Sequence, residues 1–147
     1  MNVTVAAGIL AFSVILGSCA SHPKALSVHL ADYHDKPMLN RLRVDMPDGQ
    51  APLFAEIRSV LDDHDFRSVS LAEDELGLPV LRLCFSPNGR EKYNSMAQQN
   101  LHRFLVFLVD GKLLIAPRIE SASAQECLGI DGAVTPEQAA TLKRAIR

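Results

Sequence analysis

The 147-residue sequence contains no tryptophan, and aromatic residues make up only 5% of it. It also lacks a basic cluster, because its 15 Lys and Arg residues are scattered among 17 Asp and Glu residues, for a net charge of -2. Nucleic-acid-binding domains present a basic stripe or patch, so this pattern argues against a nucleic-acid partner. The chain is long enough for one domain with a modest core, and too short for two.

The motifs of common enzyme classes are missing as well. The sequence has no Gly-x-Ser-x-Gly, no Gly-rich phosphate loop and no His-Glu-x-x-His. The cluster Asp62-Asp63-His64-Asp65 is superficially metal-like, but adjacent side chains on a loop diverge, so we interpret it as a solvated turn. His29 and His34 lie near acidic residues and are expected at the surface. We predict no catalysis, no cofactor and no metal, and keep a hydrolase with a non-obvious site as the least favoured alternative.

Charge is also absent from the side chains of the first eighteen residues. Val3 to Leu16 is an apolar run of the length of a signal-peptide core, and it is short for a membrane span. The run ends in Leu16-Gly17-Ser18-Cys19, which resembles the lipobox of bacterial lipoproteins. The resemblance implies cleavage before Cys19 and acylation, palmitate included, of the new terminus. The alternatives are an uncleaved anchor helix and a soluble protein with an apolar leader.

The residues after the cysteine bear on location. Ala20 and Ser21 follow Cys19, and the absence of Asp there implies, by resemblance to sorting in enteric bacteria, a lipoprotein of the outer membrane that faces the periplasm. Several acyl chains hold a protein stably at a membrane, where a single chain is marginal. We therefore divide the chain into a signal peptide (1–18), a tether (19–25) and a single domain (26–147).

The domain is organised around a hairpin between Leu101 and Ile119. Asp110-Gly111 separates two apolar runs, and such a dipeptide is a strong hairpin signal because a tight turn needs positive φ at both central residues. The run before the turn is apolar on both alternating faces, so we expect a central strand covered on both sides. Pro117 cannot donate a ladder hydrogen bond, and the pairing should break or bend there.

Other segments have the alternation of strands. Leu26 to Tyr33 is predicted as a strand with one wet face, made of Ser27, His29 and Ala31, and as a possible hairpin partner of residues 42–46. Residues 53–61 fit either a helix or a strand. Further strands are expected at 66–71, 79–85 and 127–130.

Two helices carry clear start signals. Ser86 and Pro87 open the first, which should end near Asn100, with Gly89 weakening its first turn. Thr135 opens the second, with Gln138 completing a capping box. We expect an α+β fold preceded by an N-terminal signal helix. It should have one mostly antiparallel sheet, two helices on one face and the N-terminal strands over part of the other.

The order of elements from Leu78 to the end resembles the head subdomain of the first periplasmic domain of SecD, a protein-translocase subunit. The matching residues are Tyr93, Asn100, Asp110-Gly111, Ala116-Pro117, Ile130, Gly132, Thr135 and Ala139. The chain departs at Ala97, where the family has Thr, and at His102, where it has Gly. The resemblance implies a SecD-head-like module (78–147) that meets polypeptide or an envelope protein. Without the later transmembrane helices of SecD, we do not expect a proton-driven motor.

Cys84 and Cys127 are the cysteines left once Cys19 is acylated. An even pair in an oxidising compartment indicates a disulfide, whereas two buried free thiols acting as small apolar residues are the alternative. Taken together, the sequence predicts a lipid-anchored periplasmic binding or scaffold protein. A purely structural lipoprotein of an envelope complex is the second hypothesis.

Overall fold

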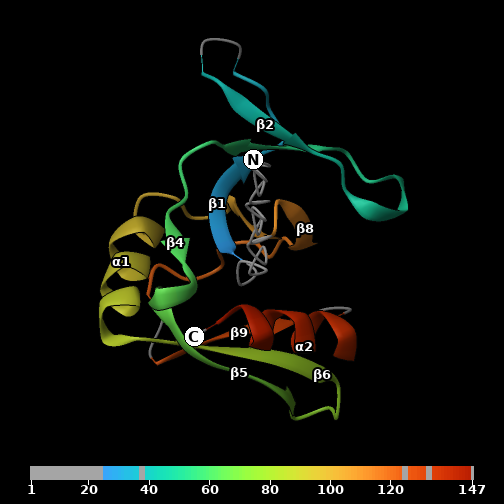
Figure 1. The fold of residues 1–147 in the computed structure, drawn as a ribbon, viewed down its shortest axis with the longest axis vertical. Helices are drawn as coiled ribbons and strands as arrows, with labels where there is room; N and C mark the ends of the chain where they lie inside the picture. The colour runs from blue at the N-terminus through green and yellow to red at the C-terminus, as the bar shows by residue number, and fades with distance from the viewer. Residues whose placement is uncertain (1–24, 37–38, 124–125, 132–133, 147) are drawn as a thin grey trace, which may run out of the picture.

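The computed structural model describes residues 25–36, 39–123, 126–131 and 134–146, and the described strands form two antiparallel sheets (Figure 1). The large sheet has the order β2-β3-β1-β7-β8, with β4 also paired to β1, and the small sheet has the order β5-β6-β9. The expectation of a single sheet is therefore wrong. The strands are β1 Leu26–Asp32, β2 Arg41–Val44, β3 Leu53–Glu56, β4 Leu61–Asp62, β5 Phe66–Glu73, β6 Pro79–Phe85, β7 Phe104–Val109, β8 Lys112–Ile115 and β9 Cys127–Asp131.

The central hairpin is confirmed as β7 and β8. Asp110 and Gly111 both have positive φ, 52° and 75°, as the tight turn requires. At this end of the sheet Ala25 and Asp110 are tied together, because each backbone N–H donates to an oxygen of the other residue over 3.1 Å. β8 ends at Ile115, but the pairing is interrupted near the proline and not ended there, since Leu105 donates to the carbonyl of Pro117 over 2.8 Å and Phe104 forms a bridge with Arg118.

β7 separates two apolar cores, as its two apolar faces predicted. Leu105, Phe107 and Val109 belong to the main core, and Val106 and Leu108 belong to a smaller second core on the other side. The helices α1 (Pro87–Ala97) and α2 (Pro136–Ala145) bury residues in the main core. The N-terminal strands supply the second core with Ala31, Val44, Leu53 and Ala55. Both helices therefore pack on one side of the large sheet, as expected. The N-terminal strands do not cover its other face as a separate layer, because β1, β2 and β3 pair within the same sheet as β7.

Three expectations for the N-terminal strands need correction. β1 has no wet face, since Ala31 is fully buried and His29 is only 8% exposed. Burial of His29 is tolerated because one ring nitrogen lies 2.8 Å from the carbonyl oxygen of Glu56 and the other 2.9 Å from the Ser27 hydroxyl. β1 and β2 do not form a hairpin, because β3 lies between them. The ambiguous segment 53–61 forms strands, not a helix.

The helix signals are confirmed. The Ser86 hydroxyl accepts from the backbone N–H of Gly89, and Thr135 and Gln138 form the predicted capping box of α2. α1 ends at Ala97, three residues before the predicted end. Gly89 is required by packing, because a Cβ there would overlap the carbonyl group of Asp65. No helix of the described residues is long and apolar enough to cross a membrane.

Candidate functional site

The exposed edge of the large sheet is strand β8, which pairs with β7 on one side and has no strand on the other among the described residues. A groove of about 210 Å³ runs along it, and most of its lining residues are apolar. One wall comes from Met46 and Pro47, which follow β2, and the other from Ile130 of β9 and Val134 before α2. An unpaired strand beside an apolar groove is the geometry that accepts an added strand.

The main chain of β8 shows which groups face this groove. The carbonyl oxygen of Leu114 accepts a hydrogen bond from the side-chain amide of Gln138 over 2.9 Å. The register shifts by one residue here, because Leu108 pairs with Leu113 and Phe107 with Ile115, so Leu114 is the extra residue of a bulge. Val109 and Lys112 flank the two-residue turn as a hydrogen-bonded pair, so the next residue, Leu113, points its N–H and C=O away from β7. The edge therefore offers main-chain groups to a partner, and α2 occupies one of them.

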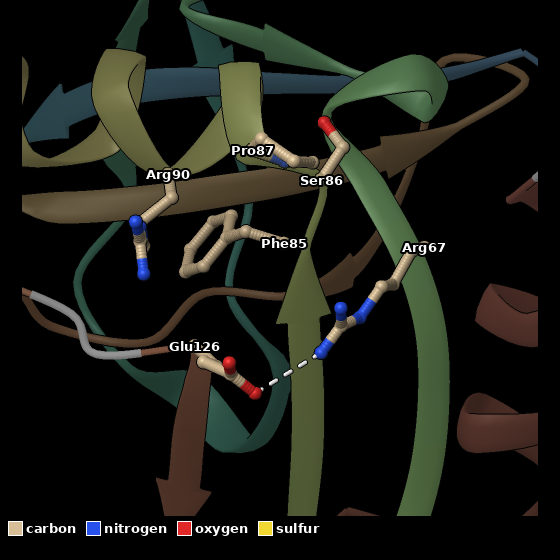
Figure 2. A pocket seen from close by; sticks show the side chains of 6 residues that line it. All are labelled: Arg67, Phe85, Ser86, Pro87, Arg90 and Glu126. Carbon is tan, nitrogen blue, oxygen red and sulfur yellow. Dashed lines mark hydrogen bonds and ion pairs between the residues drawn. The ribbon is translucent and has the colours of Figure 1, made fainter.

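A second, more polar pocket lies where β6 meets α1 (Figure 2). It has a volume of about 160 Å³, and Phe85 lies in it between the side chains of Arg67, Arg90 and Glu126. Arg67 donates to Glu126 over 3.2 Å, and its side chain is 55% exposed. Exposed, paired charges of this kind are ordinary surface groups, so the pocket by itself indicates no chemistry.

The structure brings Cys84 and Cys127 together. They are direct partners in the pairing of β6 with β9, and their sulfur atoms are bonded. Arg82, two residues before Cys84, places a guanidinium nitrogen 3.8 Å from the sulfur of Cys127. A disulfide in the protein isolated from cells stays a prediction, with free thiols as its alternative.

The acidic turn is not wholly solvated, which corrects the sequence interpretation. Asp65 is 1% exposed, and its carboxylate binds the ammonium of Lys92 over 2.8 Å and accepts from the backbone N–H of Asp62. The hydrogen bond to Asp65, resisted by burial, raises the pKa of Lys92. Asp62, Asp63 and His64 bring possible metal-ligand atoms within 4.8 Å of one another. Asp62 already caps the backbone N–H of His64, and no ligand is needed to explain its position.

A charged network at the far end of β1 was missed by sequence reasoning. Asp32 accepts from Arg41 and from Arg103, each over 3.0 Å, and Arg103 also donates to Glu56 over 2.7 Å. The four side chains come from β1, β2, β3 and the residue before β7, so only the sheet order unites them. Burial favours a higher pKa for Asp32, but the two arginines outweigh it and hold the pKa below its ordinary value of 3.8.

The same network bears on catalysis. Asp32 and His34 both line a cavity of about 390 Å³ with Arg103. The Asp32 carboxylate is held by two guanidinium groups and is therefore a poor proton acceptor. Asp32 beside His34 thus lacks the features of a general base. The sequence carried no signal for the network beyond isolated charges. The predicted acylation site, Cys19, lies outside the described residues, as do the signal peptide and nearly all of the tether.

The comparisons with known proteins agree with this fold. The family model for "SecDF, P1 head subdomain" matches residues 39–147. Two solved structures of SecDF are similar over 84% of the chain. One, in a super-membrane-facing form, has a TM-score of 0.60 at 21% identity, and the chain covers 18% of it. The other, of SecDF as a membrane component that enhances protein export, has a TM-score of 0.57 at 22% identity, and the chain covers 61% of it.

Two curated proteins match in sequence. The chain is 34% identical over 64 residues to the protein translocase subunit SecD of Acidaminococcus fermentans, and 27% identical over 88 residues to the protein translocase subunit SecDF of Thermus thermophilus. The matches span 44% and 60% of this chain, but only 15% and 12% of those relatives. Because the family model matches well over half of the sequence, the chain belongs to the SecDF P1 head subdomain family.

Proposed function

We propose that this chain is a lipid-anchored periplasmic module that binds extended polypeptide along β8 and performs no catalysis. The single observation that carries the binding role is the edge strand β8 beside an apolar groove. An extended segment that adds to such an edge gains main-chain hydrogen bonds whatever its sequence, and an apolar groove takes alternate side chains. A module that meets many different chains in transit needs this combination.

Family membership supports the same reading. The curated relatives are protein translocase subunits, and this chain corresponds to a small part of each. The module would then supply a contact for polypeptide, while the chemistry and energy of translocation lie elsewhere. The anchor is proposed at Cys19, with the outer membrane favoured, on the strength of the Leu16-Gly17-Ser18-Cys19 motif.

The binding role is tested by photocrosslinking at single positions. A photoreactive residue at Met46, in the wall of the groove, is compared with one at Arg43, which lies on β2 at the opposite edge of the same sheet. The probe is a labelled, unfolded secretory polypeptide. We expect crosslinks from position 46 and few from position 43. Equal labelling at both positions would contradict a specific site on β8.

A substitution sharpens the test. Leu113→Pro removes an N–H that faces away from β7, and proline is tolerated on edge strands where it costs no bond to the neighbouring strand. We expect the crosslinks from position 46 to fall while the melting temperature changes little. A single envelope protein crosslinked at fixed stoichiometry, with no labelling by the polypeptide, would instead favour the structural lipoprotein.

A further inference from the structure

The outer face of the small sheet presents the Cys84–Cys127 pair to solvent with little around it. Residues that are directly opposite in antiparallel strands share a face, as do alternate residues of one strand. The pairing therefore places Ser68, Ser70 and Gly129 on the same face as Arg82 and the two cysteines. Ser68, Ser70 and Gly129 are all small and all exposed, so they leave the sulfur atoms uncovered, and Arg82 is the long side chain that lies beside them.

A cavity of about 280 Å³ opens at this point, and its lining consists of Arg82, Glu126, Cys127 and Gly129. β9 is the edge of the small sheet, so no described strand lies beyond Cys127. Attack on a disulfide requires a nucleophile to approach one sulfur from the side away from the other. The cavity and the open edge give that access at Cys127, whereas Cys84 lies on the inner strand β6.

The charge at the cavity suits an anionic nucleophile. Arg82 has no carboxylate partner among the residues that the structure describes, and its guanidinium lies 3.8 Å from the sulfur of Cys127. Glu126 also lines the cavity, but its carboxylate is engaged by Arg67 at 3.2 Å. A thiolate entering the cavity therefore meets an unpaired positive charge beside the sulfur that it would attack.

From this arrangement we propose that Cys84–Cys127 is a site of thiol–disulfide exchange, reduced through Cys127 by an anionic dithiol that enters beside Arg82. The incoming thiolate forms a bond to the Cys127 sulfur, the bond between the cysteines breaks, and Cys84 leaves as a thiolate that takes a proton from water. The second thiol of the reductant, as thiolate, then attacks the mixed disulfide at the reductant's sulfur and releases Cys127 as a thiolate, which is protonated in turn. Two electrons pass from the dithiol to the cysteine pair, and the dithiol becomes a disulfide.

The test is the rate of reduction of the full chain, extracted from the bacterial envelope in mild detergent and quenched by alkylation. Two small thiols serve as probes, anionic mercaptoethanesulfonate and cysteamine, which carries an ammonium group. In Arg82→Gln we expect the rate with the anionic thiol to fall about fivefold, the factor for one charge at contact distance, and the rate with cysteamine to change little. Arg82→Lys keeps the charge and should keep the rate. Arg43→Gln, in the other sheet, is the control.

A second variant tests the cavity itself. A Cβ at Gly129 would meet only the side chain of Val80, at 3.7 Å, so Gly129→Val fits the strand and fills the space beside Cys127. We expect slower reduction by both thiols at an unchanged melting temperature. Equal rates in wild type, Arg82→Gln and Gly129→Val would overturn the proposal. So would a rate independent of thiol concentration, which indicates reduction after unfolding, or two free cysteines in the protein as isolated from cells.

Discussion

The side-chain amide of Gln138 forms hydrogen bonds with two residues, the N-cap Thr135 of its own helix α2 and Leu114 of the edge strand β8. Its oxygen accepts from the backbone N–H of Thr135, and its nitrogen donates to the carbonyl of Leu114. Gln138, in the first turn of α2, therefore caps the helix and also fastens it to β8. An edge strand left without such a partner is open to pairing with other chains, so Gln138 limits access to the site that we propose.

This double role makes a prediction for Gln138. Gln138→Ala loses the cap and the contact with β8, and we expect the free energy of unfolding to fall by about 1–2 kcal/mol. Gln138→Glu keeps the acceptor for Thr135 but turns a carboxylate oxygen toward the carbonyl of Leu114. A negative charge in the first turn favours the helix, so its loss should still be smaller than that of the alanine variant. Urea unfolding measures both. No loss in the alanine variant would show that the two hydrogen bonds contribute nothing to stability.

The charged network predicts a pH dependence. The pKa of Asp32 is lower in the folded state than its ordinary value of 3.8. The ionised carboxylate therefore contributes its full stabilisation at pH values above 3.8, and this stabilisation is lost as the pH falls through the folded pKa. Asp32→Asn should therefore cost about 1–3 kcal/mol at neutral pH, and its gap to wild type should narrow as the pH falls below 3.8 toward the folded pKa. Unfolding curves at several pH values measure the gap.

The matched control for Asp32 is Asp45→Asn. Asp45 is 78% exposed and paired with Arg43 on the surface, and such pairs contribute less than about 1 kcal/mol. A gap between wild type and Asp32→Asn that stayed constant down to pH 3 would show that the arginines do not hold Asp32 ionised.

Gly89 is predicted to be irreplaceable despite its place in a helix. Glycine to alanine in a helix interior normally stabilises by about 1 kcal/mol. Here the new methyl group would overlap the Asp65 carbonyl, and we expect a loss of about 1–3 kcal/mol. Gly129→Ala, where a Cβ has room, is the control and should be nearly neutral. Thermal unfolding of the two variants decides, and a stabilised Gly89→Ala protein would contradict the packing seen here.

His102 makes the opposite prediction. It has a φ of 67°, a conformation that favours glycine, and the SecD head resemblance places Gly at this position. We expect His102→Gly to stabilise the protein by about 1 kcal/mol, the order of the penalty for a side chain in that conformation. His34→Gly, at an exposed residue without positive φ, should destabilise it slightly. A shift of the same sign in both variants would refute the backbone explanation.

The anchor is tested by Cys19→Ser. If Cys19 is acylated, the variant should lose its lipid and move from the membrane fraction to the soluble fraction of the envelope, or persist as an uncleaved precursor. Metabolic labelling with palmitate and fractionation measure this. A variant that is processed and bound to membranes like wild type would refute lipidation at this residue.

Local signals in the sequence were sufficient for much of the fold. Asp110-Gly111, Ser86-Pro87 and the Thr135–Gln138 pair each act over a few residues, and each produced the expected turn or cap. Strand partners were harder, because alternation identifies a strand but not its neighbour. Thus β3 was not expected between β1 and β2, and the division into two sheets was missed.

The candidate site was less accessible to sequence reasoning. The groove along β8 joins Met46 to Val134, residues that only the tertiary fold brings close, and the Asp32 network depends on the same sheet order. His29 was placed at the surface because its partners, Glu56 and Ser27, offered no pattern that pointed to burial. Whether a polar side chain is buried depends on the hydrogen-bond partners that the tertiary fold brings to it, and the sequence alone does not identify those partners.

The two hydrogen bonds between Ala25 and Asp110 also bear on how the domain would be oriented at a membrane. They hold the start of β1 at the turn between β7 and β8, so a chain tethered at its N-terminus hangs from that end of the large sheet. Five residues lie between Cys19 and Ala25, and even a fully extended chain over these six steps reaches only about 20 Å. An acylated Cys19 would therefore keep the β7–β8 turn close above the lipid and turn Asp32 and Arg103 outward. β8 starts at that turn, so it would run away from the bilayer, and a polypeptide bound along β8 would run in the same direction.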